Sequence, residues 1–600
     1  MKTMDQRIGG ERPEDRLADF TRDVRVILLS LLALAIGVLS ALVAFALVNL
    51  IGLITNLAFY ARPSWEFVSP AGSALGAWVI LIPAAGGVLI GLMARYGSER
   101  IRGHGIPEAL EAILIGGSRM DFKVALLKPI SSALSLGTGG PFGAEGPIIM
   151  TGGAFGSLFS QFFHLSSAER KTLLVAGAAG GMSAIFASPV SAVLLAVELL
   201  LFEWKPRSFI PVAIASATAG ALRVPLLGSG PIFPVPPHPA LGAEGLLFAF
   251  LVGLLAGLGS CLLTVMVYGF EDLFLKLPIH WMWWPAIGGL FVGFGGWLDP
   301  RVLGVGYDTI HLLLRGDLAG MAVLGLIVGK SLVWSIALGS GTSGGVLAPL
   351  LIMGGALGAL AAPVLPVGDP ALWAMIGMAA MMGGMMRSPL TAMVFTLELT
   401  HDLNILTGLL VGCTAAHAVT VLIMRRSILT EKVARRGHHI TREYSVDPFE
   451  VLRVGEVMDQ NVPTIPETMK LAELSQRIGR GDPELSVRQG TPIVDPDGRL
   501  AGIITRGDLV RALGKGAELT VLEAGTRDLI VTYPDEPLRD ALTKMLTNDI
   551  GRLPVVSRQD PRLLLGYLGR SNILSARLRG HREEHVRETG WLARTSGRND

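Results

Sequence analysis

The distribution of apolar residues divides the chain into two parts. Apolar runs follow one another from about Val26 to Met424, and the run Val26–Ile54 exceeds the ~20 residues that a helix needs to cross a bilayer. Other runs, such as Gly344–Gly368, are interrupted by glycine and proline. Interrupted membrane helices that end at mid-membrane are typical of transporters and channels. The pattern therefore predicts a polytopic α-helical membrane domain with broken helices.

Beyond Arg425 the sequence becomes polar and basic, as expected where a chain leaves a membrane on the cytoplasmic side. The segment Gly490–Leu513 reads as strand, turn, strand and helix, and Gly551–Leu574 repeats this order. We therefore expect a soluble α/β module of two copies after the membrane domain.

These patterns predict the domain organisation. The expected parts are a cytoplasmic N-terminal segment (1–23), a membrane domain (24–436) with halves at about 24–224 and 242–425, a linker (437–449), two soluble copies (450–513 and 519–577) and a polar tail (578–600). The first residues lack the order of a signal peptide. We expect a multi-pass protein of the cell membrane with both termini in the cytoplasm.

The composition agrees with a membrane protein. Of the 600 residues, 50% are hydrophobic and 17% are charged, whereas about a quarter of a soluble protein is charged. The net charge of +2 gives no sign of a nucleic-acid partner. The two cysteines, Cys261 and Cys413, lie in apolar runs and are interpreted as small core residues. No His-Glu-x-x-His zinc motif occurs, so an intramembrane metalloprotease is excluded, and we expect neither a metal site nor enzymatic activity.

The membrane domain contains an internal repeat. The stretches Gly137–Gly156 and Gly339–Gly358 share six glycines and one proline at an offset of 202 residues, and Lys128 meets Lys330 at the same offset. At an offset of 200, the matched residues are Ser188, Pro189 and Glu198 in the first half and Ser388, Pro389 and Glu398 in the second. Repeats of this kind place the transport site between the halves, near the midplane.

Each repeated motif is a glycine-rich turn that leads into an apolar helix, with Pro147 or Pro349 in the first turn. A helix N-terminus presents free N–H groups and a partial positive charge. Two such ends that meet inside a membrane would bind an anion and repel a cation. The repeat therefore predicts an anion as the substrate.

The acidic and basic residues of the repeat differ in symmetry. Glu145 stands in the first motif where the second has Leu347, and a carboxylate at a helix N-terminus can itself occupy an anion site. We interpret Glu145 as a single tethered gate that leaves when it is protonated or displaced; a capping role is the alternative. Lys128 would add a positive field to the pathway or would pair inside the membrane. The symmetric Glu198 and Glu398 are interpreted as structural groups that accept hydrogen bonds from nearby loop amides.

Three stretches in this order, GHGIPEA from Gly103, GAEGP from Gly143 and GVLAP from Gly345, resemble the CLC family of chloride channels and chloride/proton antiporters. The resemblance covers about residues 24–436, and the C-terminal part resembles a pair of CBS domains. It implies a membrane domain of two inverted repeats with broken helices, followed by a cytoplasmic α/β CBS pair. It also implies a homodimer in the lipid membrane with one anion pathway per subunit.

The resemblance implies roles for individual residues. Glu145 matches the family's gating glutamate, and Lys128 matches a lysine near the pathway. The anion-binding positions correspond to His104, Gly105, Ile106, Gly143, Ala144, Glu145, Gly146, Val346 and Leu347. His104 replaces the serine that usually binds the central anion, and it could donate from a ring nitrogen. The selectivity between chloride and other anions is therefore open.

Two further departures from the family concern the inner gate and protons. No tyrosine occurs near Leu403 or Asn404, where the family's central tyrosine is expected. Antiporters usually carry a proton-relay glutamate directly after the position of Glu198, and that residue is Leu199 here. Glu203 is a candidate proton relay only if the helix extends that far. We therefore favour passive or weakly coupled chloride flux, with chloride/proton antiport as the alternative. A CBS-containing divalent-cation transporter is more distant, because it would need more acidic residues along its pore.

CBS pairs often bind an adenine nucleotide between their copies. The first copy here has the Gly-x-x-Thr-x-x-Asp pattern with Thr505 and Asp508, and the second has a degraded version at Gly566, Gly569 and Asn572. The resemblance therefore implies one nucleotide site, for ATP or AMP, at Thr505 and Asp508. A purely structural dimer clamp is the alternative, and transport itself is expected to require no cofactor.

Overall fold

The structure is a computed structural model, and it describes residues 25–437 except 115 and 237, and residues 452–575 except 487, 515 and 517. The predicted N-terminal segment (1–23), the polar tail (578–600) and nearly all of the predicted linker (437–449) lie outside these residues. The described residues form two compact units that separate near residue 440.

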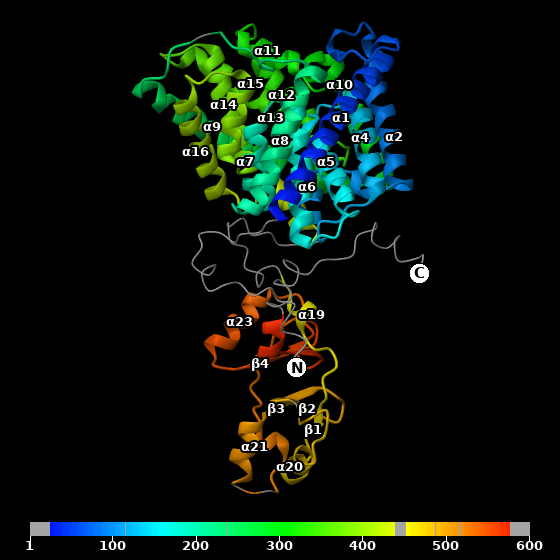
Figure 1. Cartoon of the computed structure of the whole chain (residues 1–600), viewed down its shortest axis with the longest axis vertical. Helices are drawn as coiled ribbons and strands as arrows, with labels where there is room; N and C mark the ends of the chain where they lie inside the picture. The colour runs from blue at the N-terminus through cyan, green and yellow to red at the C-terminus, as the bar shows by residue number, and fades with distance from the viewer. Residues whose placement is uncertain are drawn as a thin grey trace. The chain divides into compact units, whose positions relative to one another are not determined.

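The first unit consists of helices that pack side by side (Figure 1). Its α-helices are α1 (Arg25–Tyr60), α2 (Leu81–Tyr96), α3 (Ile106–Leu114), α4 (Phe122–Gly137), α5 (Glu145–Ser160), α6 (Ser167–Phe186), α7 (Pro189–Leu195), α8 (Pro206–Leu227), α9 (Ala243–Leu275), α10 (Trp284–Leu298), α11 (Tyr307–Arg315), α12 (Met321–Gly339), α13 (Leu347–Ala361), α14 (Pro370–Met386), α15 (Pro389–Thr400), α16 (Leu406–Ile423) and α17 (Ile428–Arg435).

Among the described residues, seven helical stretches are long and apolar enough to cross a membrane: Arg25–Tyr60, Gly76–Tyr96, Pro206–Leu227, Ala243–Leu275, Met321–Gly339, Leu347–Val364 and Leu406–Arg435. The first of these stretches, α1, shows why such a helix is suited to a membrane. In α1, Ala33 and Ile36 are buried, while the equally apolar Ile27 and Leu31 are each 63% exposed. A helix that is apolar on all sides and only partly covered by protein is suited to face lipid.

The helix pairs of the two halves pack alike. In α5, a Cβ on Gly152 would lie 2.2 Å from the carbonyl oxygen of Gly177 in α6. In α13, a Cβ on Gly354 would lie 2.4 Å from the carbonyl oxygen of Gly377 in α14. Small residues at these points let the helix backbones touch, which is how membrane helices pack closely. Cys261 in α9 and Cys413 in α16 are buried, in agreement with their interpretation as small core residues.

The second unit contains two α/β copies. The first copy comprises β1 (Ile465–Pro466), α20 (Leu471–Gly479), β2 (Gly490–Val494), β3 (Leu500–Thr505) and α21 (Arg506–Leu513), and the second comprises α23 (Leu538–Thr547), β4 (Arg552–Val556) and β5 (Leu564–Gly569). Two short helices, α19 (Val454–Val457) and α22 (Val521–Ala524), accompany them. Strand β2 lies between a parallel β1 and an antiparallel β3, and β4 pairs antiparallel with β5. Each copy has a hydrophobic core of its own.

Candidate functional site

Two helix N-termini meet in the first unit. Helix α5 begins at Glu145 and α13 at Leu347, directly after the two repeated glycine-rich turns. Gly143 and Gly345 in these turns form an antiparallel bridge: the Gly345 N–H donates to the Gly143 oxygen over 2.9 Å, and the Gly143 N–H donates to the Gly345 oxygen over 3.4 Å. Because equivalent residues of the two halves bond reciprocally, a local two-fold axis relates the halves, as it does in inverted repeats.

The carboxylate of Glu145 lies at the N-terminus of α13. Its Oε1 accepts hydrogen bonds from the backbone N–H groups of Leu347 and Ala348, the latter over 3.3 Å. The side chain is 0% exposed, and Oε2 has no hydrogen-bond partner among the described residues. The carboxylate thus takes up N–H groups that a helix N-terminus otherwise offers to an anion. Leu347 was among the predicted residues, whereas Ala348 was not, because the sequence does not reveal which amides of a first turn face inward.

The two bridging glycines leave the space that this carboxylate fills. A Cβ on Gly143 would lie 1.8 Å from Glu145 Oε2, and a Cβ on Gly345 would lie 2.5 Å from Glu145 Oε1. Both distances are shorter than any tolerable contact. Glycine is therefore required at both positions for as long as the carboxylate stays where it is.

The loop that carries His104 reaches the same place. The His104 carbonyl oxygen lies only 2.1 Å from where a Cβ on Gly146 would be. Gly103 exchanges hydrogen bonds of 3.4 Å with the second glycine-rich turn, donating to Gly341 and accepting from Gly344. His104 is 4% exposed, and its Nδ1 has no partner among the described residues. The other predicted anion-binding residues in these loops and helix starts, Gly105, Ile106, Ala144 and Val346, are also buried. The three stretches quoted above therefore converge.

The two repeated lysines hold loops, and neither forms an ion pair with a residue that the structure describes. Lys128 is fully buried, and its Nζ donates to the carbonyl oxygens of Ile101 and Gly103 over 2.8 Å each. Lys330 is likewise buried and donates to two carbonyl oxygens of residues 302–304 over 2.9 and 3.1 Å. Lys128 therefore reaches the candidate pathway through the loop that carries His104.

The equivalent contacts of Lys128 and Lys330 reveal a third repeated element, which was not predicted from the sequence. The tripeptide 103–105 corresponds to 304–306 at an offset of 201, so that Val305 is the counterpart of His104. The four flanking glycines have φ between 62° and 86°. The signal in the sequence was the Gly-x-Gly spacing common to both tripeptides, because glycine is the residue that adopts positive φ freely.

Glu108 in α3 is a second residue that sequence reasoning missed. It is 6% exposed; its Oε2 accepts from the Gly105 N–H over 3.0 Å and its Oε1 accepts from Arg436 over 2.7 Å. Arg436 also donates to Glu111 over 2.6 Å. A buried carboxylate needs such partners to offset its loss of hydration. Glu108 thus joins the loop of the candidate site to the end of α17. Its signal was an acid one turn after His104 in a mostly apolar stretch.

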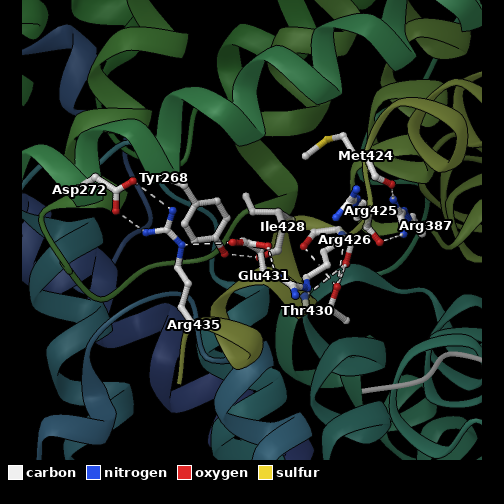
Figure 2. Close-up of polar contacts among 11 residues, drawn as sticks. Tyr268, Asp272, Arg387, Met424, Arg425, Arg426, Ile428, Thr430, Glu431 and Arg435 are labelled. Carbon is white, nitrogen blue, oxygen red and sulfur yellow. Dashed lines mark hydrogen bonds and ion pairs between the residues drawn. The ribbon is translucent and has the colours of Figure 1, made fainter. Parts of the chain in front are cut away.

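Helix α17 is held by polar contacts at both ends (Figure 2). Arg435 donates to Asp272 over 2.5 Å and to Glu431 over 3.3 Å, and its guanidinium lies 4.6 Å from the ring centre of Tyr268. The hydroxyl of Tyr268, which is 6% exposed, donates to the carbonyl oxygen of Ile428, the first residue of the helix.

The position predicted for the family's central tyrosine, near Leu403 or Asn404, is not buried. Leu403 is 74% exposed, and the side-chain amide of Asn404 donates to the carbonyl oxygen of His238 over 3.1 Å. That position is at the surface of the first unit, whereas the buried Tyr268 comes from α9.

Glu198 and Glu398 each cap the start of a helix in the opposite half. Glu198 accepts from the N–H groups of Leu390 (3.3 Å) and Thr391 (2.8 Å) at the start of α15. Glu398 accepts from two N–H groups in the first turn of α7, each over 2.8 Å. The interpretation of both residues as structural acceptors of amide hydrogen bonds is confirmed.

The first of these helices contains one more residue than its counterpart. Helix α7 continues as a π-helical turn, Ala196–Leu201, and ends at Phe202 with φ of 54°. Helix α15 stays α-helical and ends at His401 with φ of 57°. The offset between the halves is 200 at Glu198 but 199 at Phe202. A π-helical turn accommodates one inserted residue in this way.

The condition under which Glu203 could replace Leu199 is not met. The helix ends at Leu201, and the Glu203 carboxylate accepts from the Ser208 hydroxyl over 2.5 Å and pairs with Lys205 over 3.2 Å. Leu199 itself is fully buried.

In the second unit, the predicted ribose motif forms a helix cap. The hydroxyl and the N–H of Thr505 both donate to Asp508 Oδ2, over 2.6 and 2.9 Å. Burial alone would raise the pKa of the Asp508 carboxyl, but hydrogen bonds from Thr505 and Arg511 outweigh it and hold the pKa below its usual value. In the second copy, Asn572 accepts from the Gly569 N–H over 2.9 Å in the same way. The motif therefore has a capping role in both copies.

The second unit also contains a cavity of about 1370 Å³. Residues of both copies line it, among them Arg488, Arg552, Tyr567 and Arg570, and Nη1 of Arg552 is buried without a hydrogen-bond partner among the described residues. Thr505 and Asp508 are not part of its wall.

Two related helical halves whose helix N-termini converge on one buried carboxylate define a membrane protein of the anion channel and transporter class. A family model described as "Voltage gated chloride channel" matches residues 86–421, which is more than half of the chain, and the model of the CBS domain matches residues 454–515 and 521–579. The chain therefore belongs to the voltage-gated chloride channel (CLC) family and carries a CBS pair.

Individual relatives agree with this assignment. The chain is 28% identical over 566 residues to chloride channel protein CLC-f of Arabidopsis thaliana, covering 80% of this chain and 70% of the relative. It is 28% identical over 419 residues to voltage-gated ClC-type chloride channel ClcB of Escherichia coli, covering 68% of this chain and 99% of the relative. A solved structure, a slow cyanobacterial Cl⁻/H⁺ antiporter, matches with a TM-score of 0.61 at 22% identity, covering 69% of this chain and 98% of the other. The predicted fold class and family resemblance are confirmed.

Proposed function

We propose that this protein conducts chloride across a membrane through a CLC-type pathway in which Glu145 is the gate. The observation that carries the proposal is the carboxylate of Glu145 on the N–H groups of Leu347 and Ala348. Chloride needs the same donors, so the carboxylate and the anion exclude one another. The relatives named as chloride channels support chloride as the substrate.

The gate opens when the carboxylate leaves the start of α13. Protonation removes the negative charge that holds it there, and a chloride ion that competes for the amides has the same effect. The remaining predicted anion-binding residues then line the path: His104, Gly105, Ile106, Gly143, Ala144, Gly146 and Val346. His104 offers its unpartnered Nδ1 to a passing anion and so contributes to selectivity. Lys128 adds its charge through the loop it holds.

The flux is proposed to be passive or only weakly coupled to protons. Leu199 provides no acid for an internal proton relay, and Glu203 is engaged with Lys205 beyond the end of the helix. The alternative is chloride/proton antiport, which is the activity of the cyanobacterial protein that shares this fold. A divalent-cation transporter gains no support, because the converging groups are N–H donors.

The experiment is chloride efflux from liposomes that contain the purified protein, with external pH recorded at the same time. Wild type is compared with Glu145→Gln, and Glu244→Gln, an exposed acid in the first turn of α9, is the control. Chloride efflux without proton movement would support the proposal. Efflux that drives proton uptake, and that loses this coupling in Glu145→Gln, would establish the antiport alternative. No chloride flux from wild type would refute chloride as the substrate.

The setting of the pathway is proposed as well. We place the protein in the cell membrane as a homodimer, with both termini and the CBS pair in the cytoplasm.

For the CBS pair we propose that an adenine nucleotide, ATP or AMP, binds and tunes the flux. Thr505 and Asp508 are one candidate site, and the cavity lined by Arg552 and Arg570 is a second, which its size and its unpartnered Arg552 nitrogen favour.

A further inference from the structure

Residues 304–306 form the counterpart of the loop that carries His104. The N–H of Gly304 in this second loop donates to the carbonyl oxygen of Gly139 over 2.9 Å. Gly139 belongs to the glycine-rich turn that leads to Glu145. Because a local two-fold axis passes through the site, the two loops lie on opposite sides of the Glu145 carboxylate.

The loop of residues 304–306 lies on the outer side of the proposed pathway. Arg436, which directly follows α17, donates to Glu108 over 2.7 Å beside the loop of His104. From α17 the chain continues to the CBS pair, which we place in the cytoplasm. The loop of His104 is therefore on the cytoplasmic side of Glu145, and its counterpart is on the opposite side.

Tyr307 directly follows this outer loop and is the first residue of α11. At the offset of 201 it is the counterpart of Ile106, so a phenol stands on the outer side where the inner side has an apolar residue. Its ring packs against those of Phe67 and Phe233, with ring centres 6.0 and 5.5 Å apart. Its hydroxyl makes no hydrogen bond to any residue that the structure describes. The ring is thus held by packing while its donor stays unused.

The charge of the gate reaches this hydroxyl. Helix α11 is not one of the seven stretches that are long and apolar enough to cross a membrane. Burial is the main cause that raises the pKa of the Tyr307 hydroxyl above its usual value; the negative charge of Glu145 raises it further, and Arg223 of α8 lowers it. A phenol with a raised pKa keeps its proton and remains a hydrogen-bond donor. The outer side of the gate therefore holds one fixed donor within the field of the carboxylate.

We propose that the Tyr307 hydroxyl receives the Glu145 carboxylate when it leaves the start of α13, and that it stabilises the open gate in this way. The inference rests on the proposed gate and adds the group that the carboxylate binds in the open state. A carboxylate that gives up two backbone amides inside a protein needs another donor to offset its loss of hydration. Arg223, whose Nη1 donates to the Gly228 carbonyl oxygen over 2.5 Å, adds a positive charge on the same side.

The test is a double-mutant cycle on the initial rate of chloride efflux from liposomes, with the same pH on both sides of the membrane. Tyr307→Phe removes the hydroxyl and keeps the ring that packs against its neighbours. It is expected to slow efflux about tenfold, the loss that corresponds to one charge-assisted hydrogen bond to the open gate. In a Glu145→Gln background no carboxylate needs the donor, so the same change is expected to alter efflux by less than about twofold.

Tyr60→Phe is the matched control, because the Tyr60 hydroxyl donates to the Ser69 carbonyl oxygen over 2.6 Å, in the loop that also carries Phe67. Its efflux should stay within about twofold of the parent protein in both backgrounds. Equal slowing by Tyr307→Phe in both backgrounds would mean that the hydroxyl acts on the anion or on packing. That result, or no slowing in the wild-type background, would overturn this inference alone. If wild type or Glu145→Gln conducts no chloride, the proposed gate is overturned and this inference with it.

Discussion

At the scale of the residue, the site is built around groups that need a partner. Glu145 has one oxygen on the amides of Leu347 and Ala348 and one without any partner among the described residues. A buried carboxylate so incompletely bonded is held at a cost in free energy. The cost is what makes the group suited to leave, because protonation or a competing anion relieves it.

The first prediction concerns the two glycines that form the bridge between the halves. A Cβ on Gly345 would lie 2.5 Å from Glu145 Oε1 and 2.6 Å from the Gly143 oxygen. We expect Gly345→Ala to open the bridge between the halves, to lower stability by about 1–3 kcal/mol as overpacked sites do, and to abolish most chloride flux. The measurements are the apparent melting temperature in detergent and liposome efflux.

The control for this variant is Gly269→Ala in α9, where no atom lies near the added methyl group. It makes the same chemical change on an exposed helix surface and should melt and conduct as wild type does. If Gly345→Ala matched its control in both measurements, the close packing of the carboxylate against the bridge would be wrong.

At the scale of the element, the two halves stabilise each other by exchanging caps. Glu198 accepts amide hydrogen bonds at the start of α15, and Glu398 does so at the start of α7. Each helix start would otherwise present free N–H groups, which are costly where water is scarce. The exchange therefore ties the two halves together at a point other than the anion site.

The reciprocal caps predict equal effects of two substitutions. We expect Glu198→Ala and Glu398→Ala each to lower stability by about 1–3 kcal/mol, because each leaves two backbone N–H groups without their acceptor. The apparent melting temperatures of both variants should fall by similar amounts, and that of Glu244→Ala, an exposed acid at the start of α9, should hardly change. A fall in only one of the two would contradict reciprocal capping.

The elements also mark the limit of prediction from the sequence. Matched residues recur in the sequence at constant offsets of 200 and 202. They were enough to predict the repeat, the glycine-rich turns and the structural role of Glu198. The π-helical turn before Phe202 could not, because one inserted residue leaves no local signal until the two helix ends are compared. Ala348 was missed because the sequence does not reveal which amides of a first turn face inward. The contact of Glu108 with Arg436 was missed because it joins segments that only the fold brings together.

At the scale of the whole molecule, the chain combines a helical membrane unit with a CBS pair. The sequence motif pointed to Thr505 and Asp508, yet the side chain of Asp508 is occupied by its own helix cap. The large cavity of the second unit is lined instead by arginines, including Arg552. Guanidinium groups with unused donors are suited to phosphate groups.

These two candidate sites give opposite predictions for nucleotide binding by the full-length protein, measured by isothermal titration calorimetry with ATP and AMP. If the cavity is the site, Arg552→Gln weakens binding about tenfold or more, the loss of one charge-assisted hydrogen bond, and Asp508→Asn has little effect. If the capping motif is the site, the order is reversed. Arg558→Gln is the control, because Arg558 lies in the same copy and is paired with Asp535 over 2.8 Å outside the cavity wall.

Chloride efflux is then compared with and without the nucleotide that binds. A change in rate that disappears in the non-binding variant means that the CBS pair regulates the pathway, whereas equal efflux at saturating nucleotide assigns the pair a structural role only.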